Sequence, residues 1–323
     1  MNFYDLRCCG LSVESADPRF DRGLDWLIGP FAAASLPDGL KAAQIICRVG
    51  QLPDFALSGE NGTPYNVVGH DALLRAEIGG ETHIWRPGNF ACRFSANLAE
   101  VWLPENAGKA DVQFGAVMAM DHAVRTGDAF LLHCACLDAP DGKNRILLHA
   151  DSGTGKTTTA MALAEAGFAL SGDDTAIVRA GPGGAEALGL PRSARVSRAT
   201  LAMLPFLGAV TRKDAWDDND EQEISRDAMA RVFALSELGF KPVSAIINLA
   251  RKPGQSLSIA PMPAADALST ILAAALWAGG DGMAANDAGR FEAIVSLFDS
   301  APVYQMDLGS DFAAMVAAVR NMS

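Results

Sequence analysis

Basic residues are scarce in this chain. Its 323 residues include 26 Lys and Arg against 38 Asp and Glu, which gives a formal net charge of −12. Phosphate backbones repel such a field, so we expect no nucleic acid among the partners of the protein. The excess of acidic residues does not exclude a local basic pocket for a small anion.

The chain also lacks long apolar runs and paired cysteine motifs. Its longest apolar run, at residues 271–280, is shorter than the roughly 20 residues that span a bilayer;. The first seven residues lack a signal-peptide core, so we expect no membrane among the partners;. Cysteines at positions 8, 9, 47, 92, 134 and 136 form no C-x-x-C and no zinc spacing, which indicates reduced thiols and a cytoplasmic protein;.

The composition is that of a folded globular protein, with 50% hydrophobic and 20% charged residues;. Turn signals break the first part of the chain into short apolar segments, which predicts a strand-rich domain over residues 1–112. No repeat at a fixed period is present. The expected strands include residues 43–49, 73–78 and 83–85.

The pattern changes at about residue 112. Helices, short buried strands and a glycine-rich turn alternate from there, which predicts an α/β domain over residues 113–323. The expected strands are residues 129–136, 145–149, 168–171 and 243–249, and the expected helices are residues 114–124, 157–166, 264–278 and 311–320.

The glycine-rich turn, Ala-Asp-Ser-Gly-Thr-Gly-Lys-Thr at residues 150–157, stands between a predicted strand and a predicted helix. Such glycines let successive backbone N–H groups face a phosphate, and the helix start adds partial positive charge. Lys156 would reach the β- and γ-phosphates of ATP, and the Thr157 hydroxyl would help to hold Mg²⁺. Ala150 replaces the first glycine of the general pattern, which a negative φ would allow. The predicted nucleotide-binding residues are Ser152, Gly153, Thr154, Gly155, Lys156, Thr157 and Thr158.

Two adjacent acids, Asp173 and Asp174, follow the next predicted strand. One carboxylate could position the metal and the other could accept the proton of an attacking hydroxyl, although a turn or a helix cap would also explain the pair. His133 ends an apolar predicted strand and could be either a functional residue or a buried core residue. A third feature, the acidic segment 212–223, is either a solvated surface loop or an arm that attracts a basic peptide;.

The combination of these motifs resembles the HPr kinase/phosphorylase family and its relatives. The matching features are the strand that ends at Leu132 and His133, the S-G-x-G-K-[ST] turn, and a helix closed by Gly167 that leads to Asp173 and Asp174. The resemblance covers about residue 114 to the C-terminus. It implies an α/β P-loop kinase core of the HPr kinase/phosphoenolpyruvate carboxykinase type, preceded by a smaller strand-rich domain.

The resemblance also implies roles for single residues. Asp173 matches the catalytic carboxylate that acts as the base, and Lys156 and His133 match catalytic positions. Asp174 matches the second acid near the metal, and Thr157 would contact the same metal. Arg192 and Arg195 are candidates for binding phosphate or a peptide carboxylate. The family's arginine is missing from residues 236–241, a departure that bears on the HPr substrate and on the reverse phosphorylase reaction.

Three functions fit these residues. The first is an ATP·Mg²⁺-dependent phosphotransferase, an HPr-kinase-like serine kinase whose partner is a protein or peptide with a Ser/Thr acceptor. Some relatives phosphorylate lasso-peptide precursors, so the resemblance does not name the substrate. The alternatives are a kinase of a small hydroxylated metabolite and a non-catalytic module that senses ATP. Since HPr kinases form hexamers, the resemblance also leaves a homo-oligomer open.

Overall fold

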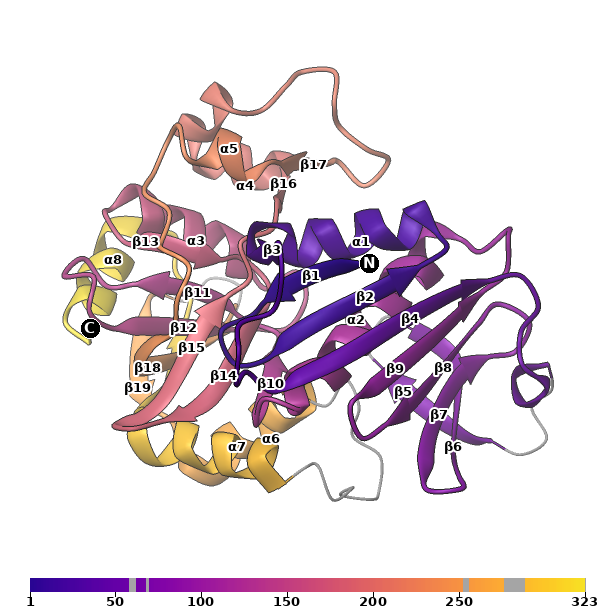
Figure 1. Ribbon diagram of the computed structural model, residues 1–323. Helices are drawn as coiled ribbons and strands as arrows, with labels where there is room; N and C mark the ends of the chain where they lie inside the picture. Colours follow the sequence, from indigo (N-terminus) through magenta and orange to yellow (C-terminus); the bar gives the residue numbers. More distant parts are fainter. Residues whose placement is uncertain (58–61, 68–69, 252–255, 276–287, 323) are drawn as a thin grey trace. The chain divides into compact units, whose positions relative to one another are not determined.

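The computed structural model describes residues 1–57, 62–67, 70–251, 256–275 and 288–322. The chain divides into two compact units (Figure 1). Residues 1–130 and 275–291 form the first unit, and residues 131–274 and 292–323 form the second. No helix among the described residues is both long enough and apolar enough to cross a membrane.

The first unit is built on a nine-stranded sheet in the order β3-β1-β2-β4-β9-β8-β7-β6-β5. The three central strands β2, β4 and β9 are parallel, whereas β9 to β5 form an antiparallel meander. The expected strands at residues 43–49, 73–78 and 83–85 are confirmed, since they lie within β4, β6 and β7. The strands are β1 (Asn2–Asp5), β2 (Gly10–Ser15), β3 (Ala32–Ala33), β4 (Ala42–Val49), β5 (Thr63–Val67), β6 (His70–Ile78), β7 (Glu81–Arg86), β8 (Phe90–Ser95) and β9 (Leu98–Leu103).

Helices α1 (Pro18–Ile28) and α2 (Lys109–Arg125) complete this unit, and the structure therefore divides later than the expected boundary at 112/113. The reason is the packing of α2, which lies against β8, β9 and α1. The rings of Phe114 and Phe90 meet edge to face with centroids 5.4 Å apart. A Cβ added to Gly115 would stand 3.0 Å from Val101, so a glycine there allows close approach to the sheet.

The second unit is also mixed α/β, with its main sheet in the order β10-β14-β15-β18-β12-β11-β13 and with β20 joining β18 and β19. Strands β12, β18 and β20 are parallel. These strands are β10 (Ala129–Leu132), β11 (Ala135–Asp138), β12 (Arg145–His149), β13 (Ala169–Gly172), β14 (Ala176–Gly181), β15 (Gly184–Gly189), β18 (Lys241–Ala250), β19 (Ser258–Pro261) and β20 (Val303–Asp307).

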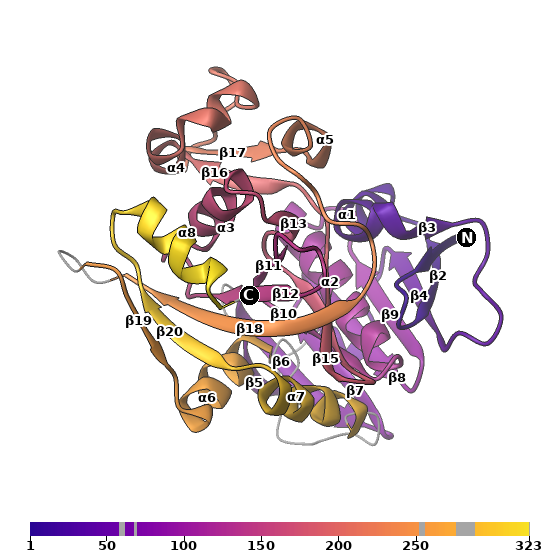
Figure 2. The ribbon, with the colours of Figure 1, turned by 90° about the vertical axis from the view of Figure 1, so that its left-hand side faces the viewer.

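Helices cover both faces of this sheet, with α3 and α8 on one side and α6 and α7 on the other (Figure 2). Apolar side chains of α3 and α8 pack on those of β11, β12 and β18 in one buried core. A two-stranded sheet of β16 and β17 carries the short helices α4 and α5. The bounds are α3 (Lys156–Glu165), β16 (Ala194–Ser197), α4 (Arg198–Met203), β17 (Glu221–Ile224), α5 (Arg226–Met229), α6 (Ala264–Ala275), α7 (Ala288–Ser300) and α8 (Phe312–Arg320).

Most predicted elements of this region are confirmed within one or two residues, but the strand expected at residues 129–136 is two strands. The chain leaves β10 at His133 and Cys134 and re-enters the sheet as β11, which pairs with β12 and β13 instead. The apolar pattern alone does not show this change of partner. The last three residues of the helix expected at 264–278 lie outside the described residues.

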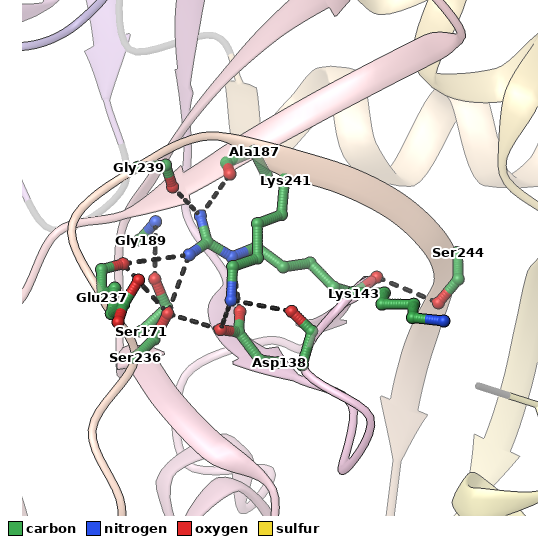
Figure 3. Close-up of polar contacts among 12 residues, drawn as sticks. Asp138, Lys143, Ser171, Ala187, Gly189, Ser236, Glu237, Gly239, Lys241 and Ser244 are labelled. Atoms are coloured by element: carbon green, nitrogen blue, oxygen red, sulfur yellow. Dashed lines mark hydrogen bonds and ion pairs between the residues drawn. The ribbon is translucent and has the colours of Figure 1, made fainter.

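A buried ion network ties the segment before β18 to β11 and β12 (Figure 3). Asp138 accepts hydrogen bonds from Arg145 Nε at 2.7 Å, Ser236 Oγ at 2.6 Å and Lys241 Nζ at 2.5 Å. Arg145 is fully buried and also donates to three backbone carbonyls, those of Ala187, Glu237 and Gly239. Ser236 and Lys241, at the two ends of the segment before β18, are therefore held by a carboxylate of β11.

Candidate functional site

A turn between β12 and α3 forms one side of the site. Gly153 has φ of +78° and Gly155, the residue that caps α3, has φ of +118°. Only glycine adopts these angles without strain, so the turn depends on both residues. Ala150, which begins the turn, is buried in the core with 1% of its surface exposed, and its φ is not positive. Alanine therefore fits the position where the general pattern has glycine.

Lys156, the first residue of α3, contacts the side chains of His133 and Asp174 in the second unit. It is 8% exposed, and its Nζ stands 2.6 Å from His133 Nε2 and 3.0 Å from Asp174 Oδ1. Burial lowers the pKa of Lys156 to about 8, an effect that the charge of Asp173 opposes;. The ammonium group is thus charged at neutral pH but close to its titration.

His133 is a neutral member of this cluster. Burial, together with the positive charges of Lys156 and Arg192, lowers its pKa to about 4;. A neutral ring has one donor and one acceptor nitrogen. Since Nε2 faces an ammonium group and Nδ1 lies 3.3 Å from Asp174 Oδ1, we assign the proton to Nδ1. His149, the last residue of β12, fixes the chain here because its Nδ1 lies 3.3 Å from the His133 carbonyl oxygen.

Asp173 has one carboxylate oxygen bound and one without a partner. Its Oδ2 accepts a hydrogen bond from Thr157 Oγ1 at 3.1 Å, whereas its buried Oδ1 meets no donor among the described residues. The side chain is only 4% exposed, and burial raises its pKa, which the charges of Lys156 and Arg192 oppose;. A buried carboxylate in this state can take a proton from a ligand. It can also bind a hard cation such as Mg²⁺.

Arg192 reaches the same cluster because two backbone segments approach closely. A Cβ on Gly172, at the end of β13, would stand 2.7 Å from the Leu190 oxygen, and one on Gly189 would stand 2.6 Å from Gly172 N. The chain after β15 thus runs beside Asp173 and Asp174, and Arg192 donates to Asp174 Oδ2. Both oxygens of Asp174 therefore bind cationic groups.

Two predicted residues lie elsewhere. Arg195, on β16, is exposed and pairs with Asp217 and with Glu221 at 3.2 Å, so the structure does not bring it to the cluster. Thr158 is 5% exposed and its hydroxyl meets Thr200 Oγ1 at 2.9 Å. Successive residues of a helix differ by about 100° around its axis, which turns Thr158 to another face than Thr157.

Within the turn itself, Ser152 and Gly153 are exposed and Thr154 is half-buried. The acidic segment 212–223 is exposed along most of its length, and neighbouring arginines compensate part of its charge. Arg198 pairs with Asp220 at 2.7 Å and Arg212 with Asp214 at 3.3 Å. These contacts fit a surface loop that belongs to the second unit.

The residues present fit Mg²⁺ only together with ligands from a bound molecule. Thr157 offers a hydroxyl and Asp174 offers a carboxylate, which are the hard donors that Mg²⁺ binds, often beside nucleotide phosphates;. Among the residues that the structure describes, no group of three or more His, Cys, Asp or Glu side chains is arranged to hold a metal ion.

The chain matches no protein-family model, and no curated protein is similar to it in sequence. Among solved structures, it is similar to the HPr(Ser) kinase/phosphatase from Coxiella burnetii, with a TM-score of 0.33 and 11% sequence identity. That likeness covers 59% of this chain and 94% of the other. A TM-score this low leaves the function to be argued from the side chains of the cluster.

Proposed function

We propose that the protein is an ATP·Mg²⁺-dependent kinase that transfers the γ-phosphate to a Ser/Thr hydroxyl of a protein or peptide. The observation that carries this proposal is the buried Oδ1 of Asp173, which has no partner among the described residues and lies in the same cluster as Thr157, Lys156 and Arg192. A base, phosphate-binding groups and a cation ligand in one place are the parts that phosphoryl transfer needs.

Lys156 and Arg192 are the side chains that we assign to the phosphates. Both donate hydrogen bonds to Asp174, one to each carboxylate oxygen. The oxygens of a bound phosphate would accept the same hydrogen bonds. Nucleotide phosphates would compete with Asp174 for these two cations and release its oxygens. Asp174 and Thr157 would then hold Mg²⁺, which supplies neutralisation of the charge on the phosphates. His133 keeps Lys156 in position through its neutral Nε2.

Asp173 would act as the base. Its Oδ1 accepts the proton of the acceptor hydroxyl while the hydroxyl oxygen bonds to the γ-phosphorus and the bond from that phosphorus to the ADP oxygen breaks. Burial raises the pKa of Asp173, which makes the carboxylate a better proton acceptor;. A polypeptide acceptor is supported by the motif resemblance. Reaction with ATP suits a cytoplasmic protein, and the six buried free thiols suit that compartment too;.

The test is to follow the label from γ-labelled ATP. Purified protein is incubated with Mg²⁺ and a lysate of its own source, beside Lys156→Ala, and the label is separated into polypeptide and small molecules. Label in polypeptide with wild type alone supports the proposal. Label only in small molecules would replace it with a metabolite kinase, and intact ATP binding without transfer would replace it with a sensing module.

The affinity for ADP should depend on pH through Lys156. Its pKa is about 8, so the free ammonium group is charged below pH 8 and loses its proton above it. Because phosphate binds the charged form, the Kd for ADP should be constant from about pH 7 to 7.5 and about tenfold higher at about pH 9. Calorimetric titration across this range measures it. Arg192, whose pKa is about 10, stays charged throughout.

The control for this profile is Lys156→Met, which should bind ADP weakly and with no change between about pH 7 and 9. A wild-type profile as flat as that of the variant would contradict the assignment of Lys156 to the phosphates.

A further inference from the structure

We propose that Arg251 is a second nucleotide-binding cation, which holds the diphosphate that leaves as ADP. This inference rests on the proposed function, because it assigns a ligand to the same turn. Arg251 directly follows β18 and was not among the candidates that the sequence motifs indicated.

The topology brings Arg251 to the phosphate turn. Strands β12 and β18 are parallel and paired, with His149 opposite Asn248. The carboxyl ends of parallel neighbours lie at the same edge of a sheet, which is where ligands bind in open α/β sheets. The chain therefore leaves β12 into the turn at residue 150 and leaves β18 into Arg251 at the same edge.

The guanidinium group lies against the backbone of the turn. A Cβ added to Gly155 would stand 3.0 Å from Arg251 Nη2 and 3.5 Å from Leu308, which follows β20. Gly155 precedes Lys156 and caps α3, the helix whose N-terminus faces the phosphates in such a turn;. A phosphate held by the N–H groups of this turn would thus come within reach of the guanidinium.

The charge of Arg251 has no partner within the described part of the chain. Its side chain is exposed, and no carboxylate among the described residues lies within ion-pair distance of it. Other arginines of this unit do have such partners: Arg192 pairs with Asp174 and Arg212 with Asp214. A guanidinium fork donates two parallel hydrogen bonds to phosphate oxygens, so an anion at the turn would satisfy it.

The location of Arg251 indicates which phosphates of the nucleotide it would bind. Lys156 and Arg192 both contact Asp174, beside the proposed base, and so lie at the end where the phosphoryl group is transferred. Arg251 makes none of these contacts and lies beside Gly155. The turn's N–H groups cradle the α- and β-phosphates, so Arg251 is assigned to the diphosphate, which ADP retains.

Calorimetric titration with ADP and with ATP tests this assignment on Arg251→Met, which keeps an apolar stem, and Arg251→Lys, which keeps the charge. Arg251→Met should weaken ADP and ATP equally, by about 10- to 100-fold, and Arg251→Lys should restore part of the affinity. In the transfer assay the KM for ATP should rise while kcat stays close to that of wild type. Arg212→Met, which removes an exposed arginine away from the turn, should leave both affinities unchanged.

The outcomes separate this inference from the proposed function. Weaker ADP binding by Arg251→Met, in a protein that transfers no phosphate, would support the inference and overturn the kinase. Normal ADP binding and KM in Arg251→Met, with active transfer, would overturn the inference alone. A loss of ATP affinity without a loss of ADP affinity would overturn the assignment to the diphosphate. Wild-type protein that binds neither nucleotide would overturn both.

Discussion

Replacing Asp173 with Asn is expected to slow phosphoryl transfer by about 10²- to 10⁴-fold, the usual contribution of a positioned general base. The amide keeps the size of the side chain and can still accept from Thr157, but it cannot take the proton of the acceptor hydroxyl;. The affinity for ADP should stay within about threefold, because the phosphates bind to Lys156 and to the turn. Single-turnover transfer and ADP titration on the same preparation measure both quantities.

The matched control is Asp218→Asn, which removes a carboxylate from the exposed acidic segment. This variant should transfer phosphate at the wild-type rate. If Asp173→Asn kept the wild-type rate as well, the carboxylate would not be the base and the mechanism proposed for this cluster would be wrong. If the rate fell only because ADP binding was lost, Asp173 would be a binding residue instead.

The second large effect concerns stability. Asp138→Ala should lower the free energy of unfolding by about 3–5 kcal/mol, the cost of leaving one member of a buried ion network without its partner. Arg145 is fully buried, and it would lose its only carboxylate partner among the described residues. Lys241 and Ser236 would lose the same acceptor. Urea unfolding of wild type and variant gives the difference.

Glu186→Ala is the control for this prediction. It breaks the ion pair between Arg179 and Glu186, which has a similar N–O distance of 2.8 Å but is partly exposed to water. A pair of this kind contributes about 0–1 kcal/mol. If both variants lost the same free energy of unfolding, the larger contribution that we assign to the buried network would be wrong. In the double variant Asp138→Ala/Arg145→Met, the loss should be smaller than in Asp138→Ala alone, since no buried charge is left unpaired in β12.

Local sequence patterns predicted the parts of the site that depend on neighbouring residues. The strand, the glycine turn and the helix at residues 145–166 follow from short-range rules, because glycine permits the φ values that the turn needs and the apolar pattern marks the flanking elements. The carboxylates at Asp173 and Asp174 could be assigned to the site because they end the next strand.

Features that depend on long-range packing could not be predicted in this way. The apolar run 129–136 divides at His133 because the two halves pair with different strands. Helix α2 belongs to the first unit because of where it packs, which its own sequence does not show. Arg251 reaches the turn through the pairing of β12 with β18, although 98 positions of sequence separate the paired residues Arg145 and Val243.

ATP binding to wild type and to Lys156→Met is the measurement that tests the central claim most directly, since every assignment above requires nucleotide phosphates at this turn. The ammonium group of Lys156 is the buried cation nearest the start of α3 in the cluster. Calorimetry should show ATP binding by wild type and about 100-fold weaker binding by Lys156→Met, the loss expected for a hydrogen bond between charged groups. Equal affinities in two folded proteins, or no binding of ATP by wild type, would contradict it.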